Sequence, residues 1–275
     1  MPDLPFRRIA IAGGSQGIGA ALALTLAAPG RQLHLCARAA GPLAESAAAC
    51  RARGAEVRVQ PCDLTRPGAG ARWLAEVAAA TGAPPDLVIV AAGIFGGRPE
   101  GATETPEAVS RAVIAATLTG PLTLTEAAAA QMRRAGAGQI VLLGSLAARD
   151  PLPDARAYSA SKAGLACYAR ALRADLAGSG VGVLLVEPGH VATRQTAQHQ
   201  GPLPLLLSPE AAAARILAAL ARGRDHLAFP RRAVWALAVL NALPPGWRAA
   251  LLRDQRFSVQ NLPEPGAPQA GQGRR

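Results

Sequence analysis

The sequence predicts an α/β protein built on a single doubly wound, parallel β-sheet with helices on both faces. Short apolar runs alternate with longer Ala- and Leu-rich stretches from residue 8 to residue 229, which is the pattern of repeated βα units. The length of 275 residues suits one large α/β unit with a sizeable core. Because crossovers between parallel strands are right-handed, the doubly wound arrangement is the favoured topology.

The first half of the chain supplies four expected strands with three helices between them. Each strand is a short apolar run near glycine, proline or charged residues, and each helix is rich in Ala or Leu. The strands cover residues 8–12, 32–37, 56–60 and 86–90, and the helices cover residues 17–28, 42–53 and 70–80.

The second half begins with two long helical stretches and ends in an extension. Helices are expected over residues 106–116, 121–134, 157–177 and 209–222, and strands over residues 139–143, 181–186 and 226–229. We expect residues 1–230 to form one domain and residues 231–257 a helical extension. Residues 258–275 include a Pro-, Gly- and Gln-rich stretch, which predicts a disordered tail.

Composition excludes several classes of protein. Hydrophobic residues make up 50% of the chain and charged residues 17%, so global disorder is excluded. The net charge of +11 first indicates a polyanionic partner, but Lys162 is the only lysine and arginine accounts for the other 28 cations. Such arginine usage reads as compositional bias. Since no helix carries a clustered basic stripe, we expect no nucleic-acid partner.

The cysteine, histidine and apolar patterns bear on metal binding and on the cellular location of the protein. The four cysteines show no metal-ligand spacing and the four histidines do not cluster with acids, so we expect free, buried thiols and no metal site. No secretory signal is visible, and the apolar stretch 233–243 is too short to span a bilayer. We therefore expect a cytoplasmic protein without a transmembrane segment.

A glycine-rich turn follows the first expected strand. Gly13, Gly17 and Gly19 have the spacing G-x-x-x-G-x-G and open a helix, the context in which such a turn binds a nucleotide pyrophosphate. A tight βα turn without a ligand is the alternative. After the second expected strand stands Arg38, where an NAD-binding protein would present an acid to the ribose. A guanidinium there can bind a 2′-phosphate, so NADP is favoured over NAD.

A second candidate site is the segment Tyr158-Ser159-Ala160-Ser161-Lys162. Residues four apart lie on one face of a helix, so the Tyr158 phenol and the Lys162 ammonium should be neighbours. A nearby positive charge favours the ionised phenol, which makes the pair a plausible proton donor and acceptor. A surface helix with an ordinary Tyr and Lys is the alternative, but the solitary lysine argues against it.

These motifs, in this order, resemble the short-chain dehydrogenase/reductase family over residues 8–229. The resemblance implies a Rossmann-like sheet of about seven strands, NAD(P) as cofactor, and a homodimer or homotetramer. It implies that Ser145, thirteen residues before Tyr158, orients the substrate, that Tyr158 is the acid/base, and that Lys162 lowers its pKa and holds the nicotinamide ribose. The implied cofactor-binding residues are Gly13, Ser15, Gln16, Gly17, Ile18, Gly19, Arg38, Asp63, Leu64, Ala92, Gly93, Tyr158, Lys162, Pro188, Gly189, Val191 and Thr193.

The chain departs from the family pattern at three places. Ala12 stands where threonine is usual, and Val90-Ala91-Ala92-Gly93 lacks both asparagines of the N-N-A-G segment. Thr117 stands where the family has an asparagine that helps to hold a proton-relay water. The Thr117 hydroxyl can still bind water, so Thr117 remains a candidate catalytic residue with Ser145, Tyr158 and Lys162.

The resemblance implies reversible NADPH-dependent reduction of a ketone or aldehyde. The apolar segment 202–207 has two equally favoured explanations. Its leucines either contact a hydrophobic or acyl-bearing substrate or only pack the loop over the pocket. The extension 231–257 could lie on a membrane surface as a basic amphipathic helix, although a cover over the pocket or a subunit contact is favoured. The alternatives in function are a weakly active or inactive NADP-binding scaffold or sensor, and a sugar-nucleotide epimerase or dehydratase. A sugar-nucleotide epimerase or dehydratase usually has a longer segment after the position of Thr193 than this chain has.

Overall fold

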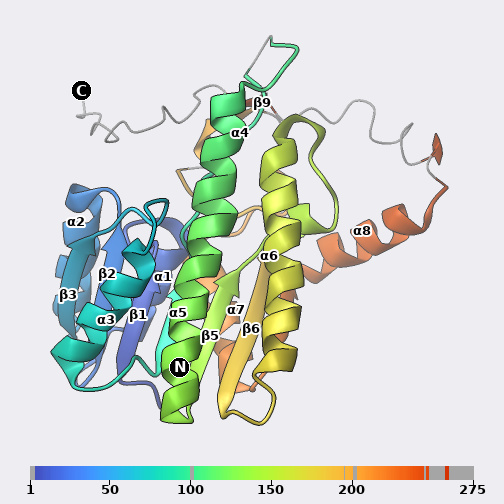
Figure 1. Cartoon of the computed structure of the whole chain (residues 1–275). Coiled ribbons are helices and arrows are strands. Elements are labelled where there is room, and N and C mark those ends of the chain that lie inside the picture. Colours follow the sequence, from blue (N-terminus) through green and yellow to red (C-terminus); the bar gives the residue numbers. More distant parts are fainter. Residues whose placement is uncertain are drawn as a thin grey trace.

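The computed structural model describes residues 4–99, 102–194, 196–200, 203–244, 246–247 and 258–259. Within them, seven strands form one parallel sheet in the order β3-β2-β1-β4-β5-β6-β8. The strands are β1 (Arg8–Ala12), β2 (Gln32–Ala37), β3 (Glu56–Pro61), β4 (Leu87–Val90), β5 (Gly138–Leu143), β6 (Val181–Pro188) and β8 (His226–Phe229). The expected doubly wound sheet is confirmed, with its strand order reversing between β1 and β4 (Figure 1).

Helices cover both faces of this sheet because successive residues of its buried strands point to opposite sides. Along β1, Ile9 and Ile11 pack into one core, and Ala10 and Ala12 pack into the other. The first core is closed by α1 (Gly17–Leu26), α2 (Ala40–Arg51) and α7 (Pro209–Ala221). The second is closed by α3 (Ala69–Thr81), α5 (Gly120–Ala135) and α6 (Arg156–Asp175), which lie in front of the sheet in Figure 1.

The two helices expected over residues 106–116 and 121–134 are one continuous helical run. Helix α4 (Glu107–Ile114) passes into α5 through a π-helical turn, η1 (Ala115–Thr119). Pro121 did not separate the helices because it lies in the first turn of α5, where its missing N–H is tolerated. By length and composition the run 107–135 could cross a membrane, but Leu124 and Met132 are buried in the core against the sheet, as in an ordinary core helix.

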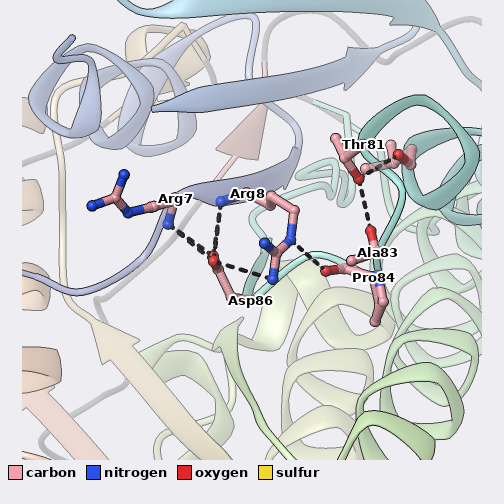
Figure 2. Close-up of polar contacts among 7 residues, drawn as sticks. Arg7, Arg8, Thr81, Ala83, Pro84 and Asp86 are labelled. Atoms are coloured by element: carbon pink, nitrogen blue, oxygen red, sulfur yellow. Dashed lines mark hydrogen bonds and ion pairs between the residues drawn. The ribbon is translucent and has the colours of Figure 1, made fainter. Parts of the chain in front are cut away.

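Polar contacts fasten the N-terminal edge of the sheet. The Asp86 carboxylate, just before β4, accepts hydrogen bonds of 3.0 Å from the backbone N–H groups of Arg7 and Arg8 (Figure 2). Arg8 Nε also donates to the carbonyl oxygen of Pro84, at 3.0 Å. These contacts hold the start of β1 against the start of β4. The opposite, C-terminal edge carries the predicted site residues.

The C-terminal extension contains α8 (Arg231–Ala242), which begins directly after β8. Ser258 and Val259 form β9, which pairs antiparallel with β7 (His199–Gln200). These two residues are the first of the predicted tail. The rest of the predicted tail, residues 260–275, lies outside the described residues.

Candidate active site

The predicted site residues meet at one edge of the main sheet because its seven strands all run in the same direction. The glycine-rich turn follows β1, Arg38 follows β2, and Asp63 follows β3. Ala92 and Gly93 follow β4, Ser145 follows β5, and Pro188 ends β6. The remaining predicted residues lie on α1, on η1, on α6 and in the loop after β6. This is the edge at which ligands bind in open α/β sheets.

The glycine-rich turn has no room for side chains. Gly13 has a φ of +86°, and a Cβ on it would lie 2.7 Å from the backbone nitrogen of Ala92. A Cβ on Gly19 would lie 2.1 Å from the carbonyl oxygen of Gly13. The turn is also held to β2, because the N–H of Gly13 donates to the carbonyl oxygen of Cys36 at 2.8 Å. Glycine is therefore required here for close packing as well as for any approach of a phosphate.

The N-terminus of α1 fits an anionic ligand. The residue before the helix, Gln16, makes no side-chain cap, and no acidic residue lies in the first turn. The first N–H groups and the positive end of the helix dipole are thus not neutralised by the protein's own side chains. With the glycine turn beside it, this terminus is suited to the pyrophosphate of a dinucleotide.

Arg38 and Asp63, which are predicted to contact the 2′-phosphate and the adenine, differ in the partners that they already have. The Arg38 side chain is exposed, and its guanidinium has no hydrogen bond or ion pair with any described residue. Asp63 is partly buried, and its Oδ1 accepts hydrogen bonds from the backbone N–H of Thr65 (3.0 Å) and from the Thr65 hydroxyl (2.8 Å). The Asp63 carboxylate is therefore held in a fixed orientation by its own turn.

Ser145, Tyr158 and Lys162 come together as predicted. The Tyr158 phenol forms a hydrogen bond with the Ser145 hydroxyl, which also accepts the N–H of Ala147 at 3.1 Å. Lys162, one helical turn after Tyr158 on α6, lies 5.7 Å from the centroid of the Tyr158 ring. Its Nζ donates to the carbonyl oxygen of Leu143 at 2.7 Å, so the end of β5 fixes the position of the ammonium group.

Burial shifts both titrating groups, in opposite directions. It raises the pKa of the Tyr158 phenol above its usual value, and the hydrogen bond from Ser145 opposes that rise. Burial also lowers the pKa of Lys162 to about 8, because desolvation disfavours the ammonium form. The expectation that Lys162 leaves Tyr158 with a lowered pKa is therefore not met by this structure, in which desolvation of the phenol dominates.

Thr117 lies within the π-helical turn and is completely buried. Its hydroxyl donates to the carbonyl oxygen of Ile94 at 2.9 Å and accepts the N–H of the same residue at 3.0 Å. The single proton of the hydroxyl is thus used inside the protein. Thr117 therefore holds the loop after β4 to the long helix.

The loop after β6 closes over the start of α1. Gly189 donates its N–H to the carbonyl oxygen of Phe229 at 2.7 Å, and the Thr196 hydroxyl donates to the carbonyl oxygen of Val191 at 2.8 Å. The methyl group of Thr193 lies 3.0 Å from where a Cβ on Gly17 would be. The predicted segment from Pro188 to Thr193 is therefore adjacent to the glycine-rich turn.

A buried ionic cluster at this edge was not predicted. The Glu187 side chain is buried at the end of β6, where it accepts hydrogen bonds from Arg149 Nε (2.8 Å) and Nη2 (2.5 Å) and contacts His226 Nε2 at 2.7 Å. Arg149 follows the short helix η2 (Leu146–Ala148), next to Ser145. The cluster therefore joins the Ser145 turn to the end of β6 and to the first residue of β8. Its only sequence signal is a lone acid at the end of the apolar run 181–186.

A second unpredicted contact fixes the approach to α6. Arg98 forms an ion pair with the buried carboxylate of Asp154, and its N–H donates to the Asp154 carbonyl oxygen at 2.7 Å. A Cβ on Gly97 would lie 2.4 Å from the same carbonyl oxygen. The loop after β4 is thus held against the turn that precedes Tyr158.

We expect Glu187→Gln to lower the free energy of unfolding by about 2–4 kcal/mol, because it leaves a half-buried guanidinium without its counter-charge. Chemical denaturation monitored by circular dichroism measures the change. Glu107→Gln is the matched control: Glu107 forms an exposed i,i+4 ion pair with Arg111, and its loss should cost no more than about 0.5 kcal/mol. Equal effects of the two substitutions would contradict a structural role for the Glu187 cluster.

Known proteins match this arrangement in sequence and in structure. The model of a family described as short chain dehydrogenase matches residues 7–202. The chain belongs to the short-chain dehydrogenase family. The family's members bind NAD(P), which agrees with the glycine-rich turn and the uncapped start of α1.

Individual relatives extend the match over most of the chain. An uncharacterised oxidoreductase of Myxococcus xanthus is 32% identical over 239 residues, covering 87% of this chain and 92% of that protein. An uncharacterised oxidoreductase of Mycobacterium tuberculosis is 35% identical over 238 residues, covering 86% and 92%. A solved short-chain dehydrogenase from Sphingobium yanoikuyae in complex with NADPH superposes with a TM-score of 0.74 at 27% identity, covering 91% and 96%. This short-chain dehydrogenase is therefore related to oxidoreductases along most of its length.

Proposed function

We propose that this protein reduces a ketone or aldehyde to an alcohol with NADPH, reversibly, and uses Tyr158 as the acid/base. The observation that carries the proposal is the hydrogen-bonded pair of Tyr158 and Ser145, with the solitary lysine one helical turn away and bonded to the end of β5. These three groups lie at the sheet edge that also carries the glycine-rich turn. A nucleotide-binding scaffold without chemistry would have no need for this grouping.

The residues at this edge fit a nicotinamide dinucleotide. The turn from Gly13 to Gly19 and the uncapped N-terminus of α1 would hold the pyrophosphate, and Asp63 the adenine. Lys162 would bind the nicotinamide ribose, and the segment from Pro188 to Thr193 the carboxamide. When bound, the nicotinamide supplies the hydride that the protein's own side chains cannot provide.

The side chains supply the proton and the electrostatic support. As the carbonyl carbon accepts hydride, its oxygen gains negative charge, and the Ser145 hydroxyl donates a hydrogen bond to it. The Tyr158 phenol transfers its proton to that oxygen, so carbonyl, hydride and proton together give the alcohol. In the reverse direction the tyrosinate removes the proton from the alcohol. A raised pKa keeps Tyr158 protonated in the resting protein, which suits the reductive direction.

The proposed preference for NADPH rests on Arg38. We expect Arg38→Ala to raise the Kd for NADPH about tenfold and to leave the Kd for NADH nearly unchanged, because only the 2′-phosphate loses a charge-assisted partner. Isothermal titration with both nucleotides measures this. The control is Arg134→Ala, an exposed arginine in the last turn of α5, near the start of β5 and so at the opposite edge of the sheet. Tighter binding of NADH than of NADPH by the unmodified protein would refute the preference.

We further infer a hydrophobic or acyl-bearing substrate. Leu207 forms a bridge with Val191, which brings the apolar segment 203–207 beside the loop assigned to the nicotinamide. A panel of ketones and aldehydes with increasing alkyl chain length tests this inference. Values of kcat/KM that rise with chain length would support it, and a flat series would contradict it.

The remaining expectations concern the assembly and setting of the protein. We infer a homodimer or homotetramer in the cytoplasm, with residues 1–230 as the catalytic domain and residues 231–257 as an extension. Sedimentation velocity at micromolar concentration tests the oligomeric state.

A further inference from the structure

Helix α8 projects from the layered body of the molecule (Figure 1) and buries none of its residues. Trp235 and Val239 lie four residues apart on one face and are 67% and 62% exposed. Trp247, just beyond the helix, is 71% exposed. These are the three most exposed large apolar side chains among the described residues, so α8 presents an apolar face without a partner.

A second apolar group lies close to α8 in the fold. Leu205 and Leu206 are 46% and 47% exposed, and Leu205 has a φ of +57°, a conformation that costs a leucine about 1 kcal/mol. The loop from Gly189 to His190 joins the two groups. Gly189 donates to Phe229 just before α8, and His190 accepts the N–H of Leu207. The segment with the exposed leucines and the start of α8 therefore flank the same short loop.

The inward side of α8 is fastened to the body. The amide Nδ2 of Asn241 donates to the carbonyl oxygen of Arg149 at 3.1 Å, and the helix starts directly from β8. Asn241 is also the only polar residue between Ala233 and Leu243. The one polar side chain of this stretch thus faces the protein, while tryptophan and valine face outward.

The charge of this segment distinguishes between two possible partners of the apolar face, a second copy of the chain and an anionic surface. Between residue 226 and residue 247 the sequence contains two arginines, Arg231 and Arg232, and no Asp or Glu. A symmetric contact with a second copy would bring this segment against itself, so four arginines would meet without an acidic partner from the same segment. An anionic surface is the favoured partner, because it supplies a counter-charge to each arginine.

We propose that α8, with Trp235 and Val239 outward, docks this protein on an anionic phospholipid surface. With 12 residues, α8 is too short to cross a bilayer, so it lies in the interface with Trp235 among the acyl chains and with Arg231 and Arg232 at the phosphates. Leu205 and Leu206 then face the same surface, at the loop beside the site. Docking requires no turnover, so its test is independent of the proposed reductase activity.

The test is co-sedimentation of the full-length protein with vesicles of phosphatidylcholine alone or mixed with phosphatidylglycerol. We expect binding only to the mixed vesicles, and a shift of tryptophan emission to shorter wavelength, since Trp73 is already buried and Trp235 and Trp247 are exposed. Trp235→Glu should lower the partition coefficient at least about tenfold. Val59→Glu, the same change at an exposed apolar residue of β3, should leave it unchanged.

Three outcomes would overturn the proposal. The first is no binding of the unmodified protein to either kind of vesicle. The second is equal binding by Trp235→Glu, which would assign the attraction to the net charge of +11 and not to α8. The third is a self-associated protein that binds no vesicles and that Trp235→Glu converts to a smaller species, which would make α8 a contact between copies.

Discussion

Tyr158→Phe lowers kcat for NADPH-dependent carbonyl reduction by about 10²–10⁴-fold, the usual contribution of a general acid. The phenylalanine ring keeps the edge-to-face contact with Phe95, whose centroid lies 4.9 Å from that of Tyr158, so the packing of the site is retained. Only the hydroxyl that bonds to Ser145 is lost. The substitution should therefore leave the Kd for NADPH and the melting temperature nearly unchanged.

The chain offers a matched control in its other tyrosine. Tyr168 lies on the same helix, and its hydroxyl donates to Glu126 at 2.8 Å, away from the sheet edge that carries the site. Tyr168→Phe removes an identical group and should leave kcat within about twofold of the original, because it touches no part of the proposed chemistry. If steady-state assays find no carbonyl-dependent oxidation of NADPH that depends on Tyr158, while NADPH binds, the protein is a nucleotide-binding scaffold.

Lys162→Met removes the only lysine ammonium group of the chain and should lower kcat/KM by about 10²–10³-fold. The methionine side chain has nearly the same length, but it cannot donate to the Leu143 carbonyl oxygen or bind a ribose hydroxyl. Both NADPH binding and turnover should weaken, in contrast to Tyr158→Phe, which affects turnover alone. Equilibrium titration beside steady-state kinetics separates the two patterns.

The same substitution changes how stability depends on pH. Because burial lowers the pKa of Lys162 to about 8 from 10.5, the unfolded chain binds more protons than the folded one between these two values. The free energy of unfolding therefore rises with pH across that window, by about 1–3 kcal/mol from this group. The rise should be missing in Lys162→Met, which should be the relatively more stable protein below pH 8. Urea denaturation at pH 7, 8, 9 and 10 measures the difference, and parallel curves for the two proteins would contradict it.

Much of the site could be predicted because its parts are tied to strand ends. Apolar runs identify the strands, and parallel strands bring their C-terminal ends to one edge, which is where Gly13, Arg38 and Ser145 each follow a strand. The pairing of Tyr158 with Lys162 depends only on helical periodicity. By contrast, the hydrogen bond between Ser145 and Tyr158 joins two elements, and the sequence supplied it only through the family resemblance.

Other features could not be predicted, because they depend on the distances between elements. Glu187 binds partners 38 and 39 residues away, and neither Arg149 nor His226 stands out in an arginine-rich sequence. The role of the Thr117 hydroxyl was also hidden, since its partner is a backbone 23 residues earlier. Cys167 was expected to be buried and is exposed, because the apolar residues beside it face the core on the other side of α6.

The Asp86 contacts at the N-terminal edge have a consequence for how this protein can change. They join the first and fourth strands on the side remote from Ser145, Tyr158 and Lys162, so this join shares no residue with the proposed chemistry. A loop at the chemical end can lengthen or exchange its side chains without touching the join at the other end. Changes of substrate preference that are confined to such loops therefore leave the N-terminal join of β1 and β4 intact.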